Sequence, residues 1–480
     1  MSVLTYQDLQ LVGDTDTERA DFVRSVISEW KSTEVYRTAV IAEDYDRCRN
    51  TTTMQYQKMI TDIYGQQHVD STATVHRSTS NFFNIFCTQL NQYLLGNGVS
   101  WKNGNGERLG ADFDNRLQEI GKDALVGGIA FGFWNLDHVE VFRATEFAPL
   151  YDEETGALAA GVRWWQISSD KPLRAVLYEL DGYTSYLWME NSKNTPSDAW
   201  QSIGQKVYMV PKTAYRLNGV RTAAFGVEIL NGENYPSFPI VPLWGNPKKQ
   251  SELVGLREKI DAYDFILNGW ENDLDNAQIY WIIKGAGGMD DTDLSQFLDR
   301  LRNVGAAAPG DGQEVSSITV DIPYAAREQL LDRLEKQLYK DAMILNPTDI
   351  AGGASTATQI RAAYEPQNVK ADQYEYCIID FVDGILAVAG IDDEPSFTRS
   401  QIVNTQEEIT TLVAAAAYLD EEYVTRKILS ILGDGDQADE VLRRIDANDA
   451  ERLDFGAGGT EPNGTVVTGV APSGDVTGNA

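Results

Sequence analysis

Side chains that could carry out acid–base catalysis are few and scattered in this sequence. Histidine is the usual general base near neutral pH, and the 480 residues include three, His68, His76 and His138. None has the HExxH spacing of a zinc protease, and the sequence contains neither a GxSxG nucleophile elbow nor a GxxxxGKS/T phosphate loop. These patterns indicate structural histidines and disfavour nucleotide hydrolysis by this chain.

Acidic residues gather at two places where a cation could bind. One cluster, Gly287–Ser295, contains Asp290, Asp291 and Asp293, and the other is Gly433–Glu440. Neither has the D-x-D/N-x-D/N-G spacing of a calcium loop, and acidic side chains stabilise a helix N-terminus without an ion. We therefore expect no metal site and no cofactor, although a metal-dependent nuclease that uses these clusters stays open as an alternative.

The overall charge restricts the partners further. The chain has 40 basic and 72 acidic residues and a formal net charge of −32, whereas its 42% hydrophobic and 23% charged content is ordinary for a globular protein. A large negative charge opposes non-specific adhesion to nucleic acid. Any contact with DNA is therefore expected to be loose or confined to local basic positions.

The cysteines and the apolar runs predict a soluble product inside the cell. Cys48, Cys87 and Cys377 are far apart and form no CxxC pair, so neither a disulfide framework nor a zinc site is expected. The N-terminus lacks the basic and apolar regions of a signal peptide, and the longest apolar runs are too short to span a bilayer. We expect no membrane partner.

The periodicity of the N-terminal half predicts helices followed by antiparallel sheet. Residues 1–95 have apolar side chains mainly at helical spacing, and Asp112–Gly128 predicts a further helix. From Gly128 onward, aromatic and β-branched runs alternate with turn residues, which is typical of antiparallel strands. The proline-rich segment Tyr235–Pro247 predicts an extended exit linker.

Two long amphipathic helices are predicted in the second half. Ser251–Gln278 has apolar residues at three- and four-residue intervals, and Ala325–Leu345 has a stripe of leucines. Between them, Ile279–Pro323 predicts two short strands and a short helix that begins near the first acidic cluster. Further helix is predicted over Val369–Gly390, and two or three short helices over residues 405–450.

The second long helix also has a charge pattern. Arg333, Lys336 and Lys340 fall on one face, with acidic residues beside them. The structural interpretation is a solvated face with i,i+4 salt links. The functional interpretation is that this helix face lines a passage, where its few positive charges make weak contacts with a polyanion that slides past.

A break rich in small residues, Ile344–Pro366, follows that helix. Its sequence, ILNPTDIAGGASTATQIRAAYEP, contains adjacent glycines and small hydroxyl residues. A Gly-Gly-x-Ser stretch could hold a phosphate, but without a preceding strand the pattern favours a flexible hinge between helices.

Several segments, in a fixed order from about Tyr56 to Gly390, resemble those of a known family. The strongest is LREKIDAYDFILNGWENDLDNAQIYWIIKG, a helix that leads into a strand and a glycine. The others are NQYLLGNGVSW, ALVGGIAFGFWN, FAPLYDEETGALAAGVRWW, FPIVPLWGNPKKQSEL and the break that follows the second long helix. This order resembles the portal proteins of tailed bacteriophages, in their Gp6-like branch.

The resemblance implies an α+β portal-type fold that forms a ring, typically of twelve copies. It divides the chain into a helical and β wing (1–250), a first stem helix (251–278), a small α/β clip (279–323), a second stem helix (324–345), a tunnel loop (346–358), a wing helix with the approach to the crown (359–404), a helical crown (405–452) and a disordered tail (453–480). Twelve such chains would carry a charge of roughly −380, which keeps DNA from sticking in the channel.

The same resemblance implies roles for particular residues. The tunnel loop would contain Asn346, Thr348, Asp349, Gly352, Gly353, Ser355 and Thr356. The clip, with Asp290, Asp291 and Asp293, would dock partners, and Arg333, Lys336 and Lys340 would be candidate contacts to DNA in the channel. No catalytic residue, metal or cofactor is implied.

The implied function is a non-enzymatic one in the virion. The ring would sit at one capsid vertex after assembly in the host cytoplasm, nucleate the head and conduct double-stranded DNA without sequence specificity. Its other partners would be the terminase large subunit, capsid and scaffolding proteins, and later the head-completion or adaptor proteins. A different ring-forming head-to-tail connector component stays open as the structural alternative.

Overall fold

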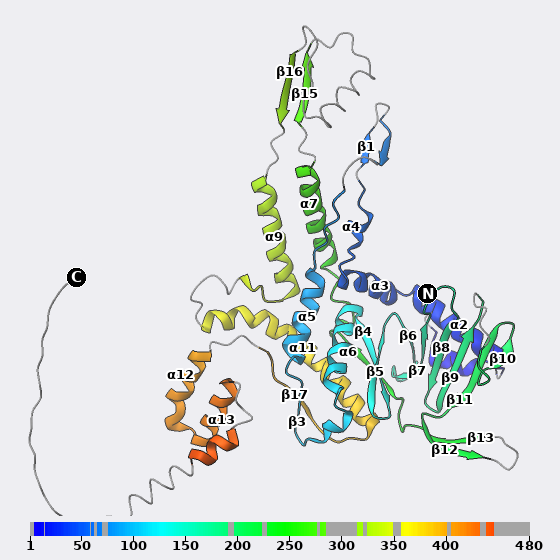
Figure 1. The fold of residues 1–480 in the computed structure, drawn as a ribbon. Helices are drawn as coiled ribbons and strands as arrows, with labels where there is room; N and C mark the ends of the chain where they lie inside the picture. Colours follow the sequence, from blue (N-terminus) through cyan, green and yellow to red (C-terminus); the bar gives the residue numbers. More distant parts are fainter. Residues whose placement is uncertain are drawn as a thin grey trace, which may run out of the picture. The chain divides into compact units, whose positions relative to one another are not determined.

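The computed structural model contains two compact units, Met1–Gln401 and Ile402–Ala480, and each is described by itself. The described residues are 4–13, 15–57, 59–61, 65–69, 75–190, 196–222, 228–275, 279–284, 314–319, 324–348, 357–400, 405–432 and 438–445. Figure 1 shows the order of the elements along the chain.

The N-terminal part of the first unit is helical. Its helices are α1 (Tyr6–Leu11), α2 (Asp16–Ser32), α3 (Glu34–Asp46), α4 (Thr51–Gln55), α5 (Phe82–Leu95) and α6 (Phe113–Gly127). Thr33 separates α2 from α3 because its backbone is extended and its hydroxyl accepts a hydrogen bond from the Tyr36 N–H at 3.2 Å. The helical prediction for residues 1–95 missed a hairpin between α4 and α5. Its strands, β1 (Met59–Thr61) and β2 (Gln67–Val69), are too short to show an alternating pattern.

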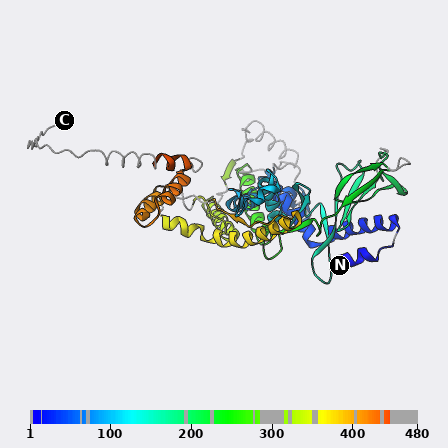
Figure 2. The same cartoon turned by 90° about the horizontal axis from the view of Figure 1, so that it is seen from below.

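Six antiparallel strands form the largest sheet. They are β6 (Phe147–Tyr151), β7 (Leu158–Trp165), β8 (Leu173–Glu179), β9 (Gly182–Trp188), β10 (Gln201–Gly204) and β11 (Val207–Thr213), in the order β10-β11-β9-β8-β7-β6. Helix α2 lies along one face of this sheet (Figure 2). Val23 and Ile27 of α2 belong to one buried cluster with Trp164 and Trp188 of the sheet. The alternating aromatic pattern therefore predicted this antiparallel sheet correctly.

A second sheet joins distant parts of the sequence. Its strands are β14 (Ile240–Trp244), β4 (Ile129–Asn135) and β5 (His138–Arg143), in that order. The prediction of an exit linker at Tyr235–Pro247 is wrong at this point, because β14 pairs with β4 along its whole length. Pro242 is compatible with this strand because β14 is at the edge of the sheet, where one row of N–H groups has no strand partner.

Helix α11 (Ala357–Ala389) completes the larger hydrophobic core. It packs against β14, β4 and α5, and its Phe381 lies over Gly132, where a Cβ atom would come within 2.5 Å of the ring. The predicted break Ile344–Pro366 is therefore too long: α11 begins at Ala357 and contains Pro366. The packing of α11 on the sheet outweighs the one backbone hydrogen bond that a proline removes.

The remaining short elements pair locally. The 3-10 helix η1 (Asn105–Leu109) follows β3 (Val99–Trp101), which pairs with β17 (Pro395–Phe397). Strand β12 (Arg216–Thr222) pairs with β13 (Glu228–Glu233). Below, the two larger sheets with α2, α3, α5, α6 and α11 are called the body.

Two helices of nineteen residues each, α7 (Arg257–Asp275) and α9 (Tyr324–Ala342), lie side by side and project from the body (Figure 1). They are called the helix pair. The antiparallel strands β15 (Ile279–Lys284) and β16 (Glu314–Thr319) follow and precede them, which confirms the two strands predicted in this stretch. The short helix predicted between these strands lies outside the described residues.

Both long helices were predicted too long. Residues 251–256 form turns, because the Ser251 hydroxyl accepts a hydrogen bond from the Leu253 N–H at 3.1 Å and Gly255 has a φ of +88°. Helix α9 ends at Ala342, because Met343 has a φ of +54°, in the left-handed region that ends helices.

The second unit is a small set of helices. They are α12 (Thr405–Ala415), the 3-10 turn η2 (Ala416–Tyr418), α13 (Glu421–Leu432) and residues 438–445. This confirms the short helices predicted between residues 405 and 450. Arg426 of α13 joins the last two, with ion pairs of 2.9 Å to Glu422 and 2.7 Å to Asp439.

Candidate functional site

The surface of α9 that faces away from α7 carries the predicted basic row. Arg333, Lys336 and Lys340 are all exposed, opposite the buried Leu331 and Leu338. The spacing of three and four residues puts the three cations on one helical face. With Gln329, Asp332 and Gln337 they line a shallow hollow.

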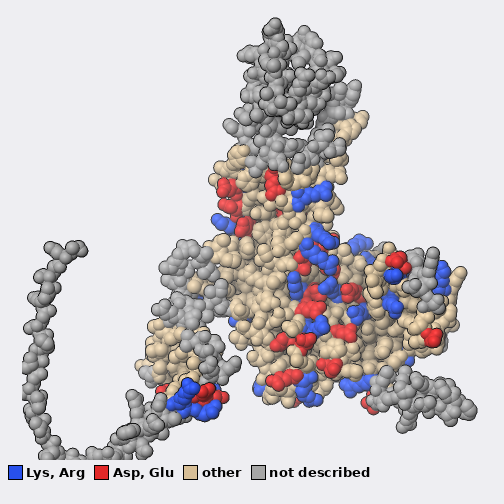
Figure 3. Space-filling view, in the orientation of Figure 1, with Lys and Arg blue, Asp and Glu red and all other residues tan. Residues whose placement is uncertain are grey.

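The basic row has no ion-pair partner among the described residues, which distinguishes it from other cations of the chain. Arg47, Arg426 and Arg444 each pair with a glutamate four residues earlier, and Lys259 of α7 pairs with Asp341 of α9. No such link joins the row to Glu328, Asp332 or Glu335 within the part of α9 that the structure describes. Figure 3 shows that most of the visible surface of the helix pair is uncharged. The cations are therefore available to an external anion.

The other side of the pair is organised by buried polar side chains. Along α7, Asp264, Asn268 and Asn272 follow one another at four-residue intervals, and their exposed fractions are 0%, 1% and 5%. They accept hydrogen bonds from the N–H groups of an extended segment, residues 76–80. The bonds are Ser80 to Asp264 (2.9 Å), Ser78 to Asn268 (2.7 Å) and His76 to Asn272 (2.8 Å). We call this set the polar ladder.

The geometry of the polar ladder follows from two regular repeats. A helix rises about 6 Å over four residues, and an extended chain advances about 6.6 Å over two, so every second N–H meets the next polar side chain. Asn268 also donates from its amide to the Ser78 carbonyl at 2.8 Å. Burial raises the pKa of Asp264, while hydrogen bonds from Asn50 and Ser80 oppose that rise. Sequence reasoning treated α7 as an apolar stripe and missed the ladder, although the Asp-x3-Asn-x3-Asn repeat was a signal for it.

The start of the predicted tunnel loop is anchored. Asn346 is 5% exposed, and its Oδ1 accepts hydrogen bonds from the N–H and the hydroxyl of Thr348, at 3.0 and 2.8 Å. The Leu345 N–H donates to Gln367 of α11 at 2.9 Å. The chain just before the loop is therefore held to α11. Asp349, Gly352, Gly353, Ser355 and Thr356 lie outside the described residues.

Lys370 of α11 contacts the end of α9 and the turns that precede α7. The Lys370 ammonium donates to the carbonyl of Ala342, the last residue of α9, at 2.7 Å, and pairs with Glu252 at 2.6 Å in the turns before α7. It lies in the wall of a pocket of about 220 Å³ between α11, the end of α9 and these turns. A cation at a helix C-terminus is favourable because the last carbonyls carry partial negative charge.

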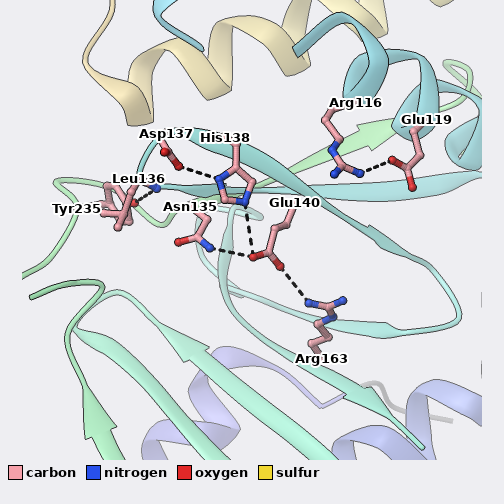
Figure 4. A network of polar contacts seen from close by, with 9 residues as sticks. All are labelled: Arg116, Glu119, Asn135, Leu136, Asp137, His138, Glu140, Arg163 and Tyr235. Carbon is pink, nitrogen blue, oxygen red and sulfur yellow. Dashed lines mark hydrogen bonds and ion pairs between the residues drawn. The ribbon is translucent and has the colours of Figure 1, made fainter. Parts of the chain in front are cut away.

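His138 belongs to a polar network at the start of β5. His138 Nδ1 lies 2.8 Å from Asp137 and its Nε2 lies 4.0 Å from Glu140, which in turn pairs with Arg163 at 3.1 Å (Figure 4). The Arg163 guanidinium lies over the Phe142 ring, 4.1 Å from its centre. The ion pair between Glu140 and Arg163 joins the edge strand β5 to β7.

The acidic clusters give no metal centre within the described residues. No group of three or more His, Cys, Asp or Glu side chains is arranged there to hold an ion. Asp290, Asp291 and Asp293 lie outside the described residues, and in the second cluster Asp439 and Glu440 pair with Arg426 and Arg444. Among the described helices, none combines the length and the apolar character needed to cross a bilayer.

Comparisons with known proteins identify the family. The family described as "Phage portal protein, SPP1 Gp6-like" matches residues 40–452. The chain belongs to this family of phage portal proteins, which confirms the resemblance to the Gp6-like branch. The portal protein of Bacillus phage SPP1 is 25% identical over 397 residues, which cover 73% of this chain and 72% of that protein. The portal protein of Clostridium phage phiCD119 is 23% identical over 224 residues, 44% of this chain and 50% of its own length.

Solved structures give more remote similarities. The neck of a native gene transfer agent particle, computed with C12 symmetry, aligns at 13% identity with a TM-score of 0.40, over 72% of this chain and 89% of that one. An HK97 family phage portal protein from Corynebacterium diphtheriae aligns at 11% identity with a TM-score of 0.32, over 68% and 96% of the two chains.

Proposed function

We propose that this chain forms a ring, typically of twelve copies, at one vertex of a phage capsid, and that double-stranded DNA enters and leaves through its axis. The ring would also nucleate head assembly in the host cytoplasm and dock the packaging and connector proteins. The family match over residues 40–452 is the observation that carries the proposal. The role is structural and non-enzymatic.

The parts of the fold suit these tasks. The body would be the wing, the helix pair the stem, the β15–β16 region the clip, and the second unit the crown. The clip, with Asp290, Asp291 and Asp293, would bind the terminase large subunit during packaging and head-completion proteins afterwards. The wing would meet capsid and scaffolding proteins. What supports this assignment is the order helix, two paired strands, helix between two parts of one body.

The basic row would supply weak contacts to DNA. Three exposed cations without an ion-pair partner among the described residues can meet phosphates without reading sequence. The chain as a whole is strongly acidic, with a net charge of −32, so the duplex would be repelled from most of the wall. A few weak contacts to phosphates, in a channel whose wall otherwise repels DNA, would let the duplex slide along the axis.

Negative-stain microscopy of the purified chain tests the ring directly. We expect closed rings with a central hole. Particles that stay monomeric at high concentration, and in the presence of the capsid and scaffolding proteins, would contradict the proposal.

The tunnel loop is tested by its glycines. Gly352→Val together with Gly353→Val should leave ring assembly intact and impair DNA packaging, because β-branched residues restrict a backbone that must change shape as the duplex passes. The measurement is the amount of packaged DNA per assembled head. Normal packaging by this variant would show that the loop is not a moving part.

A further inference from the structure

One carboxyl group of the polar ladder is buried without a positive partner. Asp264 is 0% exposed, and no lysine, arginine or histidine among the described residues forms an ion pair with it. Arg257 of the same helix pairs with Asp261 at 3.8 Å, and the negative charge of Asp261 raises the pKa of Asp264 further. An isolated carboxylate is so unfavourable in a protein interior that buried charges are normally paired or bound to a metal ion.

Two hydrogen bonds orient this carboxyl group without compensating its charge. The Ser80 N–H donates to its Oδ1 at 2.9 Å, and the side-chain amide of Asn50 donates to its Oδ2 at 2.5 Å. Both donors are neutral. An ionised carboxyl group can accept about four hydrogen bonds, so roughly half of its capacity stays available.

Oxygen atoms without a hydrogen-bond partner among the described residues surround the same group. Asn50 and Thr53 are each 1% exposed, and Asn50 Oδ1 and Thr53 Oγ1 are both enclosed and unpartnered. The orientation of the Asn50 amide is fixed, because it donates to Asp264 and to the Ser80 carbonyl. Thr53 follows three residues later in α4, which packs on α7, and therefore lies on the same helix face. Ser80 Oγ, beside the same carboxyl group, is enclosed too. We call these three atoms the enclosed oxygens.

We propose that a monovalent alkali-metal cation binds between the Asp264 carboxylate and the three enclosed oxygens. Such an ion meets two needs at once, since it compensates the buried charge and gives the oxygens a partner. A water molecule would satisfy the oxygens and leave the charge, whereas a proton on Asp264 would remove the charge and leave the oxygens unpartnered. A ligand set made only of oxygen atoms suits a hard cation. The inference does not depend on the ring.

The charge of the ligand set selects a monovalent ion. One carboxylate neutralises one positive charge, so a divalent ion would leave an excess charge buried. Calcium also takes about six to eight oxygen ligands, and magnesium keeps several of its water molecules, for which an enclosed site leaves little room. Sodium or potassium therefore fits best. The site differs in this respect from the acidic clusters considered above, because it combines a single carboxylate with neutral oxygens.

A cation at this position would join three separate parts of the chain. Asn50 immediately precedes α4, Ser80 lies just before α5, and Asp264 is in the middle of α7. The other contacts of residues 76–80 with α7 are the hydrogen bonds of the polar ladder. The stability of this junction between the helix pair and the body should therefore depend on which cation the solution contains.

Urea unfolding at one fixed total salt concentration tests the inference, with the chain dilute enough to be monomeric. Sodium chloride or potassium chloride replaces tetramethylammonium chloride stepwise. The organic cation screens surface charges equally well but is too large for an enclosed site. We expect sodium or potassium to stabilise the chain. Above the Kd of the ion, the equilibrium constant of unfolding should fall about tenfold for each tenfold rise in its concentration.

Asp264→Asn separates binding at this site from a general effect of the salt. The new side chain can still accept from the Ser80 N–H but has no charge, so the response to sodium or potassium should disappear. In tetramethylammonium chloride this variant should be at least as stable as the unsubstituted chain, because no unpaired charge is buried. Asp261→Asn is the matched control and should keep the response, since Asp261 pairs with Arg257. Equal stability of the unsubstituted chain in all three salts, or a response that Asp264→Asn shares, would overturn the inference.

Thr53→Val gives a second measurement that leaves the carboxyl group in place. Valine keeps the volume of threonine and removes only the enclosed Oγ1 atom, so the ion should bind more weakly. The concentration of sodium or potassium that gives half of the stabilisation should rise severalfold. Thr52→Val, in the same helix and partly exposed, is the control and should leave that concentration unchanged. An equal shift for both variants, or none for Thr53→Val, would contradict the proposed ligand set.

Discussion

The body and the helix pair bury their side chains in different ways. In the body, sheets are covered by helices, and large rings such as Phe131, Phe142 and Phe147 are completely enclosed. In the described part of the helix pair, apolar side chains meet along the seam between α7 and α9, and the next layer is the polar ladder to residues 76–80. Beyond the ladder and the seam, the pair exposes the basic row on α9 and Phe265 on α7.

This difference indicates which part of the chain completes its packing alone and which part can gain further burial from other molecules. A core enclosed on all sides needs no partner, whereas a pair of helices joined along one seam gains further burial only from other molecules. The polar ladder fits this division, because hydrogen bonds to an extended backbone hold α7 in place without requiring an apolar cover. We therefore expect substitutions in the body to act on folding and those on the outer faces of the pair to act on assembly and function.

The largest effect is expected in the body. Phe147→Ala removes a ring whose centre lies 4.5 Å from that of Phe131. The resulting cavity should lower the free energy of unfolding by about 3–5 kcal/mol. Urea unfolding at a concentration where the chain is monomeric measures it.

The matched change in the helix pair is Phe265→Ala. Since Phe265 is half exposed in the single chain, the free energy of unfolding of the monomer should fall by less than about 1 kcal/mol. Equal losses for Phe147→Ala and Phe265→Ala would break the comparison between the two regions.

An effect smaller than that of Phe147→Ala is expected from the polar ladder. Asn268→Ala leaves the Ser78 N–H and carbonyl without their side-chain partners, at a cost of about 2–3 kcal/mol. Hydrogen exchange should show reduced protection at the Ser78 amide while the amides of the six-stranded sheet keep theirs. Ser78→Ala is the control, because it removes only the hydroxyl bond to Glu271 and keeps the ladder. A uniform decrease of protection through the body would mean that the ladder is part of the global core.

The sequence predicted the body better than the ladder for a physical reason. Alternation along β9 is visible because one face of this strand is buried in the cluster that contains α2, and hydrophobic periodicity detects that burial directly. Strand β14 was missed because its proline, Pro242, was taken as the sign of a linker, although a proline is also compatible with an edge strand. The ladder was missed because buried Asp264 and Asn268 bind a backbone that is nearly 190 residues away in sequence. The periodicity of apolar residues in α7 gives no information about this distant partner.

The charged surface was predicted well, and the loop only in part. The three- and four-residue spacing of Arg333, Lys336 and Lys340 is a local property of a helix, so their shared exposed face followed from the sequence. Asn346 was assigned to the tunnel loop as one of seven equivalent residues, but its side chain is buried at the anchor. The neighbouring Leu345 N–H is bound by Gln367 of α11, a helix whose start at Ala357 the small-residue pattern did not indicate.

The stability of the body should depend on pH through the buried carboxyl group of Asp123. Burial raises the pKa of Asp123 in the body to about 6, although Arg143 lies 3.2 Å away and opposes the rise. Because the folded chain then holds this proton more tightly than the unfolded chain, the contribution of Asp123 to stability is largest below pH 4. It is lost as the pH rises to about 6, by about 3 kcal/mol at most. Unfolding of Asp123→Asn between pH 4 and 7 should show a flatter dependence than the unsubstituted chain. An unchanged slope would assign the pH dependence to other groups, of which Asp264 in the ladder is the first to test.

The smallest effect is expected from the basic row of α9, on the exposed surface of the helix pair. Lys336→Gln removes one cation that can meet a phosphate from each copy, so DNA binding by rings should weaken. The slope of log affinity against log salt should become shallower by about 0.9 for each phosphate that is no longer neutralised. Ring assembly should stay the same, because the proposal assigns Lys336 to the duplex and not to a neighbouring copy.

Lys340→Gln is the matched change, since both lysines are exposed and lie one helical turn apart. This substitution should make the salt slope of DNA binding shallower by a similar amount, because Lys340 belongs to the same exposed row. If neither substitution changes the slope, the basic row does not face DNA.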